Sequence, residues 1–273
     1  MMQDRISLTV TDGVADVRLD RPDKMNAIDD AMFAALDAAG RHLATLPGLR
    51  AVVLSGAGKG FCAGLDMANF AEMAGDGSSL ADTLHLRTHG AANRAQHVCT
   101  LWRDLPVPVI AAVHGMAFGG GLQIMLGADV RIVTPDVRLS IMEIKWGLIP
   151  DMAGFALTRG LVREDHLREL TFTGRQVNGE EAVRLGLATQ VSQTPLEDAL
   201  TMARRIAASN PDAIRAAKRL FNIARTADDD AILLLESLEQ QKLVSSPNQV
   251  EAVNANMEKR PPAFRDAVVP DRG

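Results

Sequence analysis

Two features of the sequence have residue types and spacing suited to acid–base chemistry beside an anion site. Three consecutive glycines, 119–121, precede the apolar segment 122–128, which is predicted to be a helix. Unpaired N–H groups at the start of a helix bind anions, and glycine lets a ligand approach the main chain closely. Further along the chain, Glu143 lies in the apolar run 141–149. The sequence therefore predicts an anion site accompanied by one isolated carboxylate.

The surroundings of Glu143 leave two interpretations open. A buried carboxylate without a partner costs several kcal/mol, so it is either paired with a cation or held with a raised pKa. Lys145 and Arg138 are the cations available nearby for pairing. A raised pKa is instead typical of a carboxyl group that transfers protons.

Other signatures of chemistry are incomplete. GAGKG (56–60) lacks both the Walker spacing and the full dinucleotide fingerprint, and there is no G-x-S-x-G motif for a hydrolase serine. His85 and His89 are four residues apart on a predicted helix, but without an acidic partner motif we expect a solvated helix face. Cys62 and Cys99 form no CxxC pair. The sequence therefore predicts no metal site.

The overall composition excludes several classes of partner. The 273 residues include 29 basic and 34 acidic side chains, a formal net charge of −5, which argues against nucleic-acid binding. No apolar run reaches the ~18 residues of a membrane helix. The first residues lack the apolar segment of a signal peptide. We therefore expect a cytoplasmic protein with no nucleic-acid or membrane partner.

Short apolar strands alternate with helices through the first two thirds of the chain. Thr11-Asp12-Gly13 predicts a hairpin turn, and Asp29 or Asp30 can cap a helix that ends near Leu46. Strands are expected at 6–10, 14–19, 50–54, 109–113, 130–133 and 137–140, a loop at 75–79, and a long helix from about 80 to 103. This alternation predicts an α/β fold with largely parallel strand pairing.

From about Thr194 the pattern predicts helices only. The segments 194–197 and 210–212 each combine a capping residue with proline at the first helical position, and 228–244 is amphipathic. We therefore divide the chain into a β-containing core, 1–193, and a helical region, 194–273. The wide apolar faces of these helices pack either on another subunit or on the core, and the sequence leaves both open.

Five segments, in register along nearly the whole chain, resemble the crotonase family, the enoyl-CoA hydratase/isomerase superfamily. They are RPDKMNAI (21–28), GKGFCAGLDM (58–67), LPVPVIAAVHGMAFGGGLQ (105–123), MEIKWGLIPDMAG (142–154) and EKRPPAF (258–264). Each motif alone is weak, but five in the right order are a specific signal. The resemblance implies a spiral of ββα units with a C-terminal helical trimerisation region, and homotrimers that often pair into hexamers.

The resemblance also implies an acyl-CoA substrate. The thioester oxygen would lie between the backbone amides of Leu65 and Gly120, and such donors stabilise an enolate by about 3 kcal/mol each. CoA would bind along Lys24, Met25, Ala63 and Gly64, with Phe264 arriving from a neighbouring subunit. Coenzyme A would enter as part of the substrate, and no permanently bound cofactor is expected. Candidate walls of the acyl pocket lie in 67–103, including Phe70, Met73 and Trp102.

The sequence departs from the hydratase pattern at Gln123, where family hydratases carry a second glutamate beside the one that matches Glu143. An amide neither takes nor gives a proton at neutral pH. Asp151 follows Pro150 at the offset where dienoyl-CoA isomerases of the family carry a catalytic aspartate. It is equally readable as a turn residue.

These residues lead to three functional hypotheses. The favoured one is double-bond isomerisation of an enoyl-CoA, with Glu143 as the acid and base, Asp151 assisting and Gln123 positioning substrate or water. Hydration of the 2,3 double bond is the close alternative. A non-catalytic acyl-CoA binder is the alternative of another class.

Overall fold

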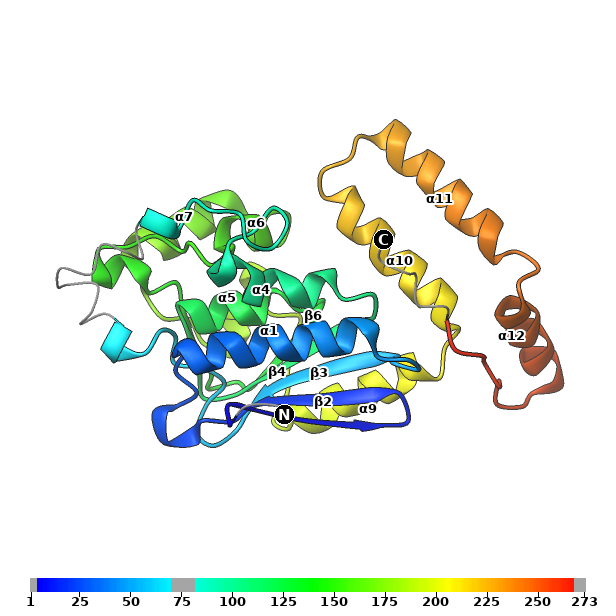
Figure 1. Cartoon of the computed structure of the whole chain (residues 1–273), viewed down its shortest axis with the longest axis horizontal. Coiled ribbons are helices and arrows are strands. Elements are labelled where there is room, and N and C mark those ends of the chain that lie inside the picture. The colour runs from blue at the N-terminus through cyan, green and yellow to red at the C-terminus, as the bar shows by residue number, and fades with distance from the viewer. Residues whose placement is uncertain (1–3, 70–81, 268–273) are drawn as a thin grey trace.

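The computed structural model describes residues 4–69 and 82–267, shown along the chain in Figure 1. Strands β1 (Ile6–Thr11) and β2 (Val14–Leu19) pair in antiparallel register. Asp12 and Gly13 join them at φ values of 50° and 77°, the left-handed geometry of a two-residue hairpin turn. The predicted hairpin is confirmed.

A six-stranded sheet, ordered β1-β2-β3-β4-β6-β8, forms the centre of the molecule. Every pairing after the hairpin is parallel. Its remaining strands are β3 (Ala51–Gly56), β4 (Val109–Val113), β6 (Val130–Val133) and β8 (Gln190–Val191). A second, two-stranded sheet pairs β5 (Met116–Phe118) with β7 (Arg138–Ser140), also in parallel. The predicted α/β class with largely parallel strands is confirmed.

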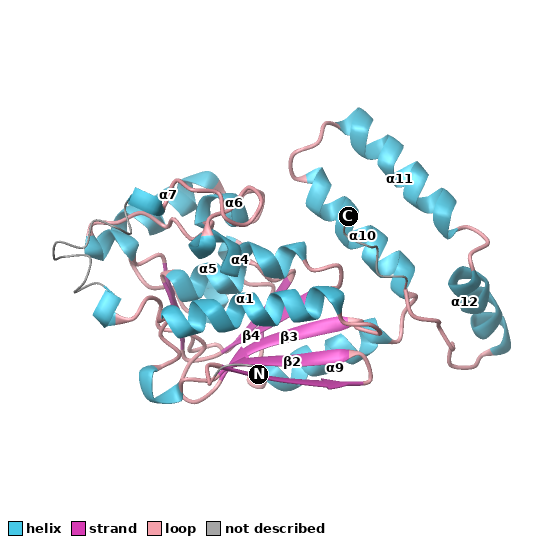
Figure 2. Cartoon of the chain, viewed as in Figure 1, coloured by secondary structure: helices cyan, strands magenta, loops and turns pink. Residues whose placement is uncertain are grey.

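Helices cover both faces of the sheet, as Figure 2 shows. One face packs beneath α1 (Asp30–Thr45), α4 (Arg94–Asp104) and α5 (Gly120–Leu126). The opposite face packs on α9 (Pro195–Ala207), whose Ala199 and Ala203 are fully buried. Because strand side chains alternate between faces, Val52 and Val53 belong to different core clusters. The helical region beyond residue 193 thus contributes one layer of the core; the predicted domain division itself stays a prediction.

The other helices lie at the two ends of the sheet. Helices α6 (Gly154–Thr158), α7 (Glu164–Thr173) and α8 (Gly179–Leu185) follow the 3-10 helix η2 (Glu143–Trp146). Helices α10 (Pro211–Ala224), α11 (Asp229–Leu243) and α12 (Pro247–Glu258) extend away from the sheet (Figure 1). Asn210 caps α10 through its side chain, whereas Thr194 makes no such bond at α9, so that part of the prediction is wrong.

The long helix expected from about residue 80 to 103 is also wrong in its first half. Helix α4 begins only at Arg94, where Asn93 and Gln96 form a reciprocal capping box. Before it the chain turns at Gly90, whose φ of +62° is left-handed. The expected loop at 75–79 lies outside the described residues. Within the described residues, no helix has the length and apolar character needed to cross a membrane.

Candidate active site

Glu143 and Gln123 meet where the end of the small sheet faces α5. Gln123 lies on α5 and is 3 % exposed, and Glu143 opens η2 directly after β7. Gln123 Nε2 donates to Glu143 Oε1 at 2.6 Å. A Cβ on Gly119 would lie 3.4 Å from the same Oε1, so the glycine leaves room for the carboxyl group.

The structure decides between the two interpretations of Glu143. Within residues 4–69 and 82–267 the Glu143 carboxylate forms no ion pair, and its buried Oε2 accepts no hydrogen bond. Lys145 lies over the Trp146 ring and Arg138 over the Phe118 ring, at 5.4 and 5.6 Å. Desolvation raises the pKa of Glu143, and the Asp151 charge adds to this; nearby backbone amides and Gln123 act in the opposite direction. Pairing with Lys145 or Arg138 is therefore wrong, and the role of Glu143 in proton transfer stays a prediction.

The Gln123 amide is held at both ends. Its Oε1 accepts a hydrogen bond from the Gly154 backbone N–H at 2.8 Å, while Nε2 faces Glu143. A Cβ on Gly154 would come within 2.8 Å of that Oε1, so the close approach requires glycine. Because the Gly154 donor fixes which end of the amide is oxygen, Glu143 Oε1 always meets an N–H donor. Apart from the glycine that ends the motif 142–154, no feature of the sequence signals this anchor.

Asp151 occupies a turn immediately after Pro150. The residue is exposed, yet desolvation of its carboxyl group raises the pKa of Asp151. Its charge is close enough to raise the pKa of Glu143 as well. Asp151 is thus a turn residue whose charge also acts on Glu143. A place in the turn is therefore compatible with the predicted assisting role.

The backbone amides of Leu65 and Gly120 lie on neighbouring segments. The Leu65 segment pairs with Ile28, whose N–H donates to Gly64 O at 2.8 Å. A Cβ on Gly64 would lie 2.7 Å from Phe118 O and 3.7 Å from Gly120 N, so the two segments touch. Neither the Leu65 nor the Gly120 N–H donates to another atom of the described chain. Both amides therefore lack a protein acceptor within the described residues.

Asn26 and Arg21 hold the Leu65 segment in place, a role that sequence reasoning missed. Asn26 is fully buried; its Nδ2 donates to the carbonyl oxygens of Ala57, Gly60 and Phe61, at 2.9, 2.9 and 3.1 Å. Arg21 pairs with Asp66, next to Leu65, at 2.5 Å. The signal was present in the motif RPDKMNAI, which contains both residues.

The predicted CoA residues fall into two places. Lys24 and Met25 end the 3-10 helix η1 (Pro22–Lys24) and are exposed, and the Ala63 N–H donates to Met25 O at 2.9 Å. Gly64 follows directly and is buried, so the four residues are neighbours beside Leu65, with Lys24 and Met25 on the outside. Phe264 belongs to the C-terminal segment and lies elsewhere in the same chain.

The position of Phe264 follows from its neighbours. Asp266 pairs with Arg50, just before β3, at 2.7 Å. The segment 63–64 follows the other end of this strand. At ~3.3 Å per residue, the length of β3 separates the two places by roughly 18 Å.

A small cavity adjoins Glu143 and Gln123. About 10 Å³ of it admits the centre of a water molecule, which is room for about one water. Its walls are otherwise mostly apolar and come from α5, α6 and α7. Of the predicted wall residues, Trp102 is fully buried in the core and does not line this cavity, whereas Phe70 and Met73 lie outside the described residues.

Comparison with known proteins shows similarity along almost the whole chain. Residues 9–267 match the family model described as enoyl-CoA hydratase/isomerase. A Mycobacterium tuberculosis protein named probable enoyl-CoA hydratase is 32% identical over 265 residues, spanning 96% of this chain and 100% of the relative. The mouse mitochondrial Delta(3,5)-Delta(2,4)-dienoyl-CoA isomerase is 30% identical over 252 residues, spanning 90% of this chain and 77% of that protein.

Solved structures show the same architecture. A putative enoyl-CoA hydratase/isomerase from Mycobacterium abscessus superposes with a TM-score of 0.87 at 31% identity, over 95% of this chain and 99% of the other. The crotonase-type fold expected from the resemblance is therefore confirmed.

Proposed function

The chain belongs to the enoyl-CoA hydratase/isomerase family, and we propose that it moves the double bond of an enoyl-CoA thioester by proton transfer through Glu143. The observation that carries this proposal is the Glu143 carboxyl group, whose pKa is raised and which is hydrogen-bonded to an amide, Gln123, and not to a second acid.

The Leu65 and Gly120 amides are assigned to the thioester oxygen. Both N–H groups lack an acceptor within the described residues, and they lie on touching segments. Donors fixed in advance stabilise the negative charge that develops on the oxygen when a proton leaves the adjacent carbon. The ion pair between Arg21 and Asp66 and the Asn26 hydrogen bonds keep the first donor in place.

Glu143 is assigned both proton transfers. Its carboxylate removes a proton from C2 of a 3-enoyl thioester, and the electron pair spreads over the thioester oxygen and C4. The protonated Glu143 then returns the proton to C4, which leaves the conjugated 2-enoyl thioester. The reaction consumes no water and needs no oxidant, and a pKa raised toward neutrality suits a group that must accept and return the same proton.

Gln123 and Asp151 support this proton carrier in different ways. Gln123 holds the Glu143 carboxylate through Nε2 and is itself held by Gly154. We therefore assign it a positioning role through Glu143, in place of direct contact with substrate. Asp151 assists because its negative charge raises the pKa of Glu143.

Hydration is the second candidate, and one observation favours it. The cavity beside Glu143 has room for about one water, and the buried Oε2 of Glu143 accepts no hydrogen bond within the described chain. The Mycobacterium tuberculosis relative, which is named as a probable enoyl-CoA hydratase, also supports hydration. Against it, addition of water across C2 and C3 is helped by a second proton carrier, and the Gln123 amide does not serve as one.

The remaining assignments concern the CoA portion of the substrate. We assign CoA to Lys24, Met25, Ala63 and Gly64, which are neighbours beside Leu65. CoA arrives as part of the thioester, and none of the proposed steps requires a permanently bound cofactor. A chain that only bound acyl-CoA would have no use for a desolvated, unpaired acid, so catalysis is favoured over the binding-only alternative.

The test compares two substrates on the same preparation. Incubation with a 3-enoyl-CoA should produce the conjugated 2-enoyl absorbance faster than crotonyl-CoA loses its absorbance by hydration. The variant Glu143→Gln should lower the isomerisation rate by ~10²–10⁴, the usual contribution of a positioned acid or base. Its affinity for the thioester should stay unchanged, because the substituted side chain keeps its shape.

The outcomes separate the hypotheses. Rapid hydration of crotonyl-CoA with slower isomerisation would reverse the preference in favour of the hydratase. Tight binding of several enoyl-CoAs without turnover would support the non-catalytic binder. A fully active Glu143→Gln variant would remove the proposed role of this residue.

A further inference from the structure

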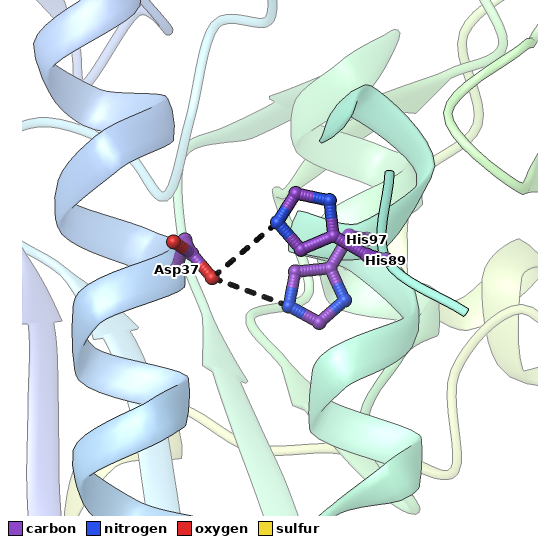
Figure 3. A group of neighbouring side chains, drawn as sticks. All are labelled: Asp37, His89 and His97. Atoms are coloured by element: carbon purple, nitrogen blue, oxygen red, sulfur yellow. Dashed lines mark ion pairs between the residues drawn. The ribbon is translucent and has the colours of Figure 1, made fainter. Parts of the chain in front are cut away.

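Three side chains that the proposed reaction does not use converge between α1 and α4, as Figure 3 shows. Asp37 lies on α1, His97 on α4, and His89 in the segment before α4. Asp37 Oδ1 lies 3.3 Å from His97 Nε2 and 3.9 Å from His89 Nε2. One ligand atom from each residue falls within 4.8 Å of the others.

The Asp37 carboxylate is only half satisfied. Its Oδ2 pairs with Arg41 at 2.5 Å. Its Oδ1 is buried and has no hydrogen bond of good geometry within the described residues; its neighbours are the two imidazole Nε2 atoms, which pair with it as ions only when protonated. A buried carboxylate oxygen that faces two imidazole nitrogens has the ligand types and the arrangement of a cation site.

Protonated histidines are a poor explanation for the cluster. The two imidazole rings stack with centroids 4.3 Å apart and planes at 17°, an arrangement in which two positive charges would repel. A neutral imidazole is the form that ligates metal ions.

Thr88 completes the surroundings of His89. Its Oγ1 lies 2.9 Å from His89 Nδ1. When Nδ1 carries the proton and donates it to this oxygen, Nε2 presents its lone pair toward Asp37 and His97. Metal-binding histidines are typically oriented by such a bond from the other ring nitrogen.

We propose that Asp37, His89 and His97 bind one divalent transition-metal ion, with Zn²⁺ the ion that the ligand set fits best. Two imidazole nitrogens and one carboxylate oxygen leave a fourth position for water, a common zinc arrangement. Tetrahedral ligand atoms at about 2.0–2.2 Å from zinc lie roughly 3.4 Å apart, so His89 must move inward. One of the two stacked rings must also turn, so that both Nε2 lone pairs, which lie in the ring planes, meet at the ion.

The ion would tie the segment before α4 to α1. None of its three ligands lines the cavity at Glu143, so the site is separate from the proposed reaction. The spacing of His85 and His89 did not predict it, because that segment is not helical and His85 stays exposed outside the cluster. The partner of His89 is His97, from the following helix.

The experiment titrates the untagged full chain with Zn²⁺ against a chromophoric chelator and measures the metal content by elemental analysis. We expect one Zn²⁺ per chain, and an affinity at least ten-fold weaker in His89→Ala and in His97→Ala. The matched control His85→Ala removes an exposed histidine four residues from His89 and should bind like the parent chain. Added Zn²⁺ should raise the Tm of the parent and the control but not of His97→Ala.

Two results would overturn the proposal. One is the lack of a saturable site at micromolar Zn²⁺, and the other is a site with equal affinity in all the histidine variants. Because His89 lies outside any helix, His89→Ala keeps the test valid even where His97→Ala fails to fold. Circular dichroism establishes which variants are folded.

Discussion

At the residue scale, the neighbours of Glu143 set its pKa in opposite directions. Desolvation and the charge of Asp151 favour the neutral acid, whereas the Gln123 N–H favours the carboxylate. Glu143 must be ionised before it can take a proton, so kcat/KM falls at low pH. The pH at which it falls, the acidic limb of the profile, reports the pKa of Glu143. Because the folded-state pKa lies above 4.5, the limb should lie above the ordinary range of a glutamate.

Substitutions of the two neighbours should therefore move the acidic limb in opposite directions. Gln123→Leu removes a donor that stabilises the carboxylate, so the pKa of Glu143 rises and the limb of kcat/KM moves to higher pH. Asp151→Asn removes a negative charge, so the same pKa falls and the limb moves to lower pH. The measurement is kcat/KM against pH, with the pKa of isotopically labelled Glu143 followed by NMR where a variant is slow.

Shifts of equal sign in the two variants would contradict this electrostatic account. The raised pKa also carries a stability consequence with a defined sign. The folded chain binds the Glu143 proton more tightly than the unfolded chain does, so its stabilising effect is complete below the unfolded pKa and is lost as pH rises through the folded one.

The candidate site was predictable from sequence in its chemistry but not in its supports. Gly119–Gly121 and Glu143 can be recognised as candidates because glycines and a carboxylate are unusual in such apolar stretches. The bond from Gly154 to Gln123 spans 31 positions and depends on how α6 packs against α5. The spacing of residues along the sequence does not predict a hydrogen bond of this kind.

At the element scale, turn and capping residues predicted where most helices and strands begin and end. The prediction failed where two such sequence signals pointed to different positions. Asp12-Gly13 forms the predicted hairpin turn, and Asn210 caps α10 as predicted. Both effects involve only backbone groups close to these residues in the sequence. The start of α4 was missed because helical periodicity before Asn93 outweighed the capping box that Asn93 forms with Gln96. Thr194 was misjudged because proline at the first position already starts α9 without a side-chain cap.

A buried lysine, Lys218, holds α10 to the core. Lys218 Nζ lies 2.7 Å from Asp129 Oδ2 and donates to the carbonyl oxygens of Trp102 and Val107, at 3.1 and 2.8 Å. Burial lowers the pKa of Lys218, and Asp129 opposes that shift. The ammonium thus satisfies three acceptors that belong to different parts of the core.

Lys218→Met should lower the free energy of unfolding by about 2 kcal/mol, because the carbonyl oxygens of Trp102 and Val107 then lose a buried, charged hydrogen-bond donor. Arg219→Met is the matched control: the adjacent Arg219 is half exposed and pairs with Glu239 on the surface. Its loss should stay below ~1 kcal/mol. Urea denaturation of both variants measures the difference, and equal losses would show that α10 is held by other contacts.

At the scale of the whole molecule, the C-terminal helices present apolar side chains without partners. Helix α11 buries none of its residues, although α9 packs fully on the sheet. The largest exposed apolar side chains of this region are Phe221 (78%), Met257 (79%), Leu234 (60%) and Leu233 (58%). Surfaces of this kind mark contacts between proteins. For α11, packing on the core is thereby excluded, and a neighbouring subunit is the expected partner.

We therefore predict a homotrimer, alone or paired as a hexamer, in which Phe264 completes the CoA surface of a neighbour. Phe264 lies two residues before Asp266, which pairs with Arg50 just before β3, whereas the segment 63–64 follows the other end of this strand. Light scattering should give a multiple of three times the 29.3 kDa chain. Leu234→Asp with Leu238→Asp should dissociate it, because charges then face the apolar contact.

The control Glu236→Ala changes an exposed polar residue of the same helix and should leave the mass unchanged. If subunits share the CoA site, dissociation should also weaken thioester binding at least ten-fold while circular dichroism stays constant. Phe264→Ala should weaken binding without changing the mass, which separates loss of the aromatic contact from loss of assembly. A monomeric parent chain at micromolar concentration, or a dissociated variant that binds thioester as tightly as the parent, would show that each chain builds its CoA surface alone.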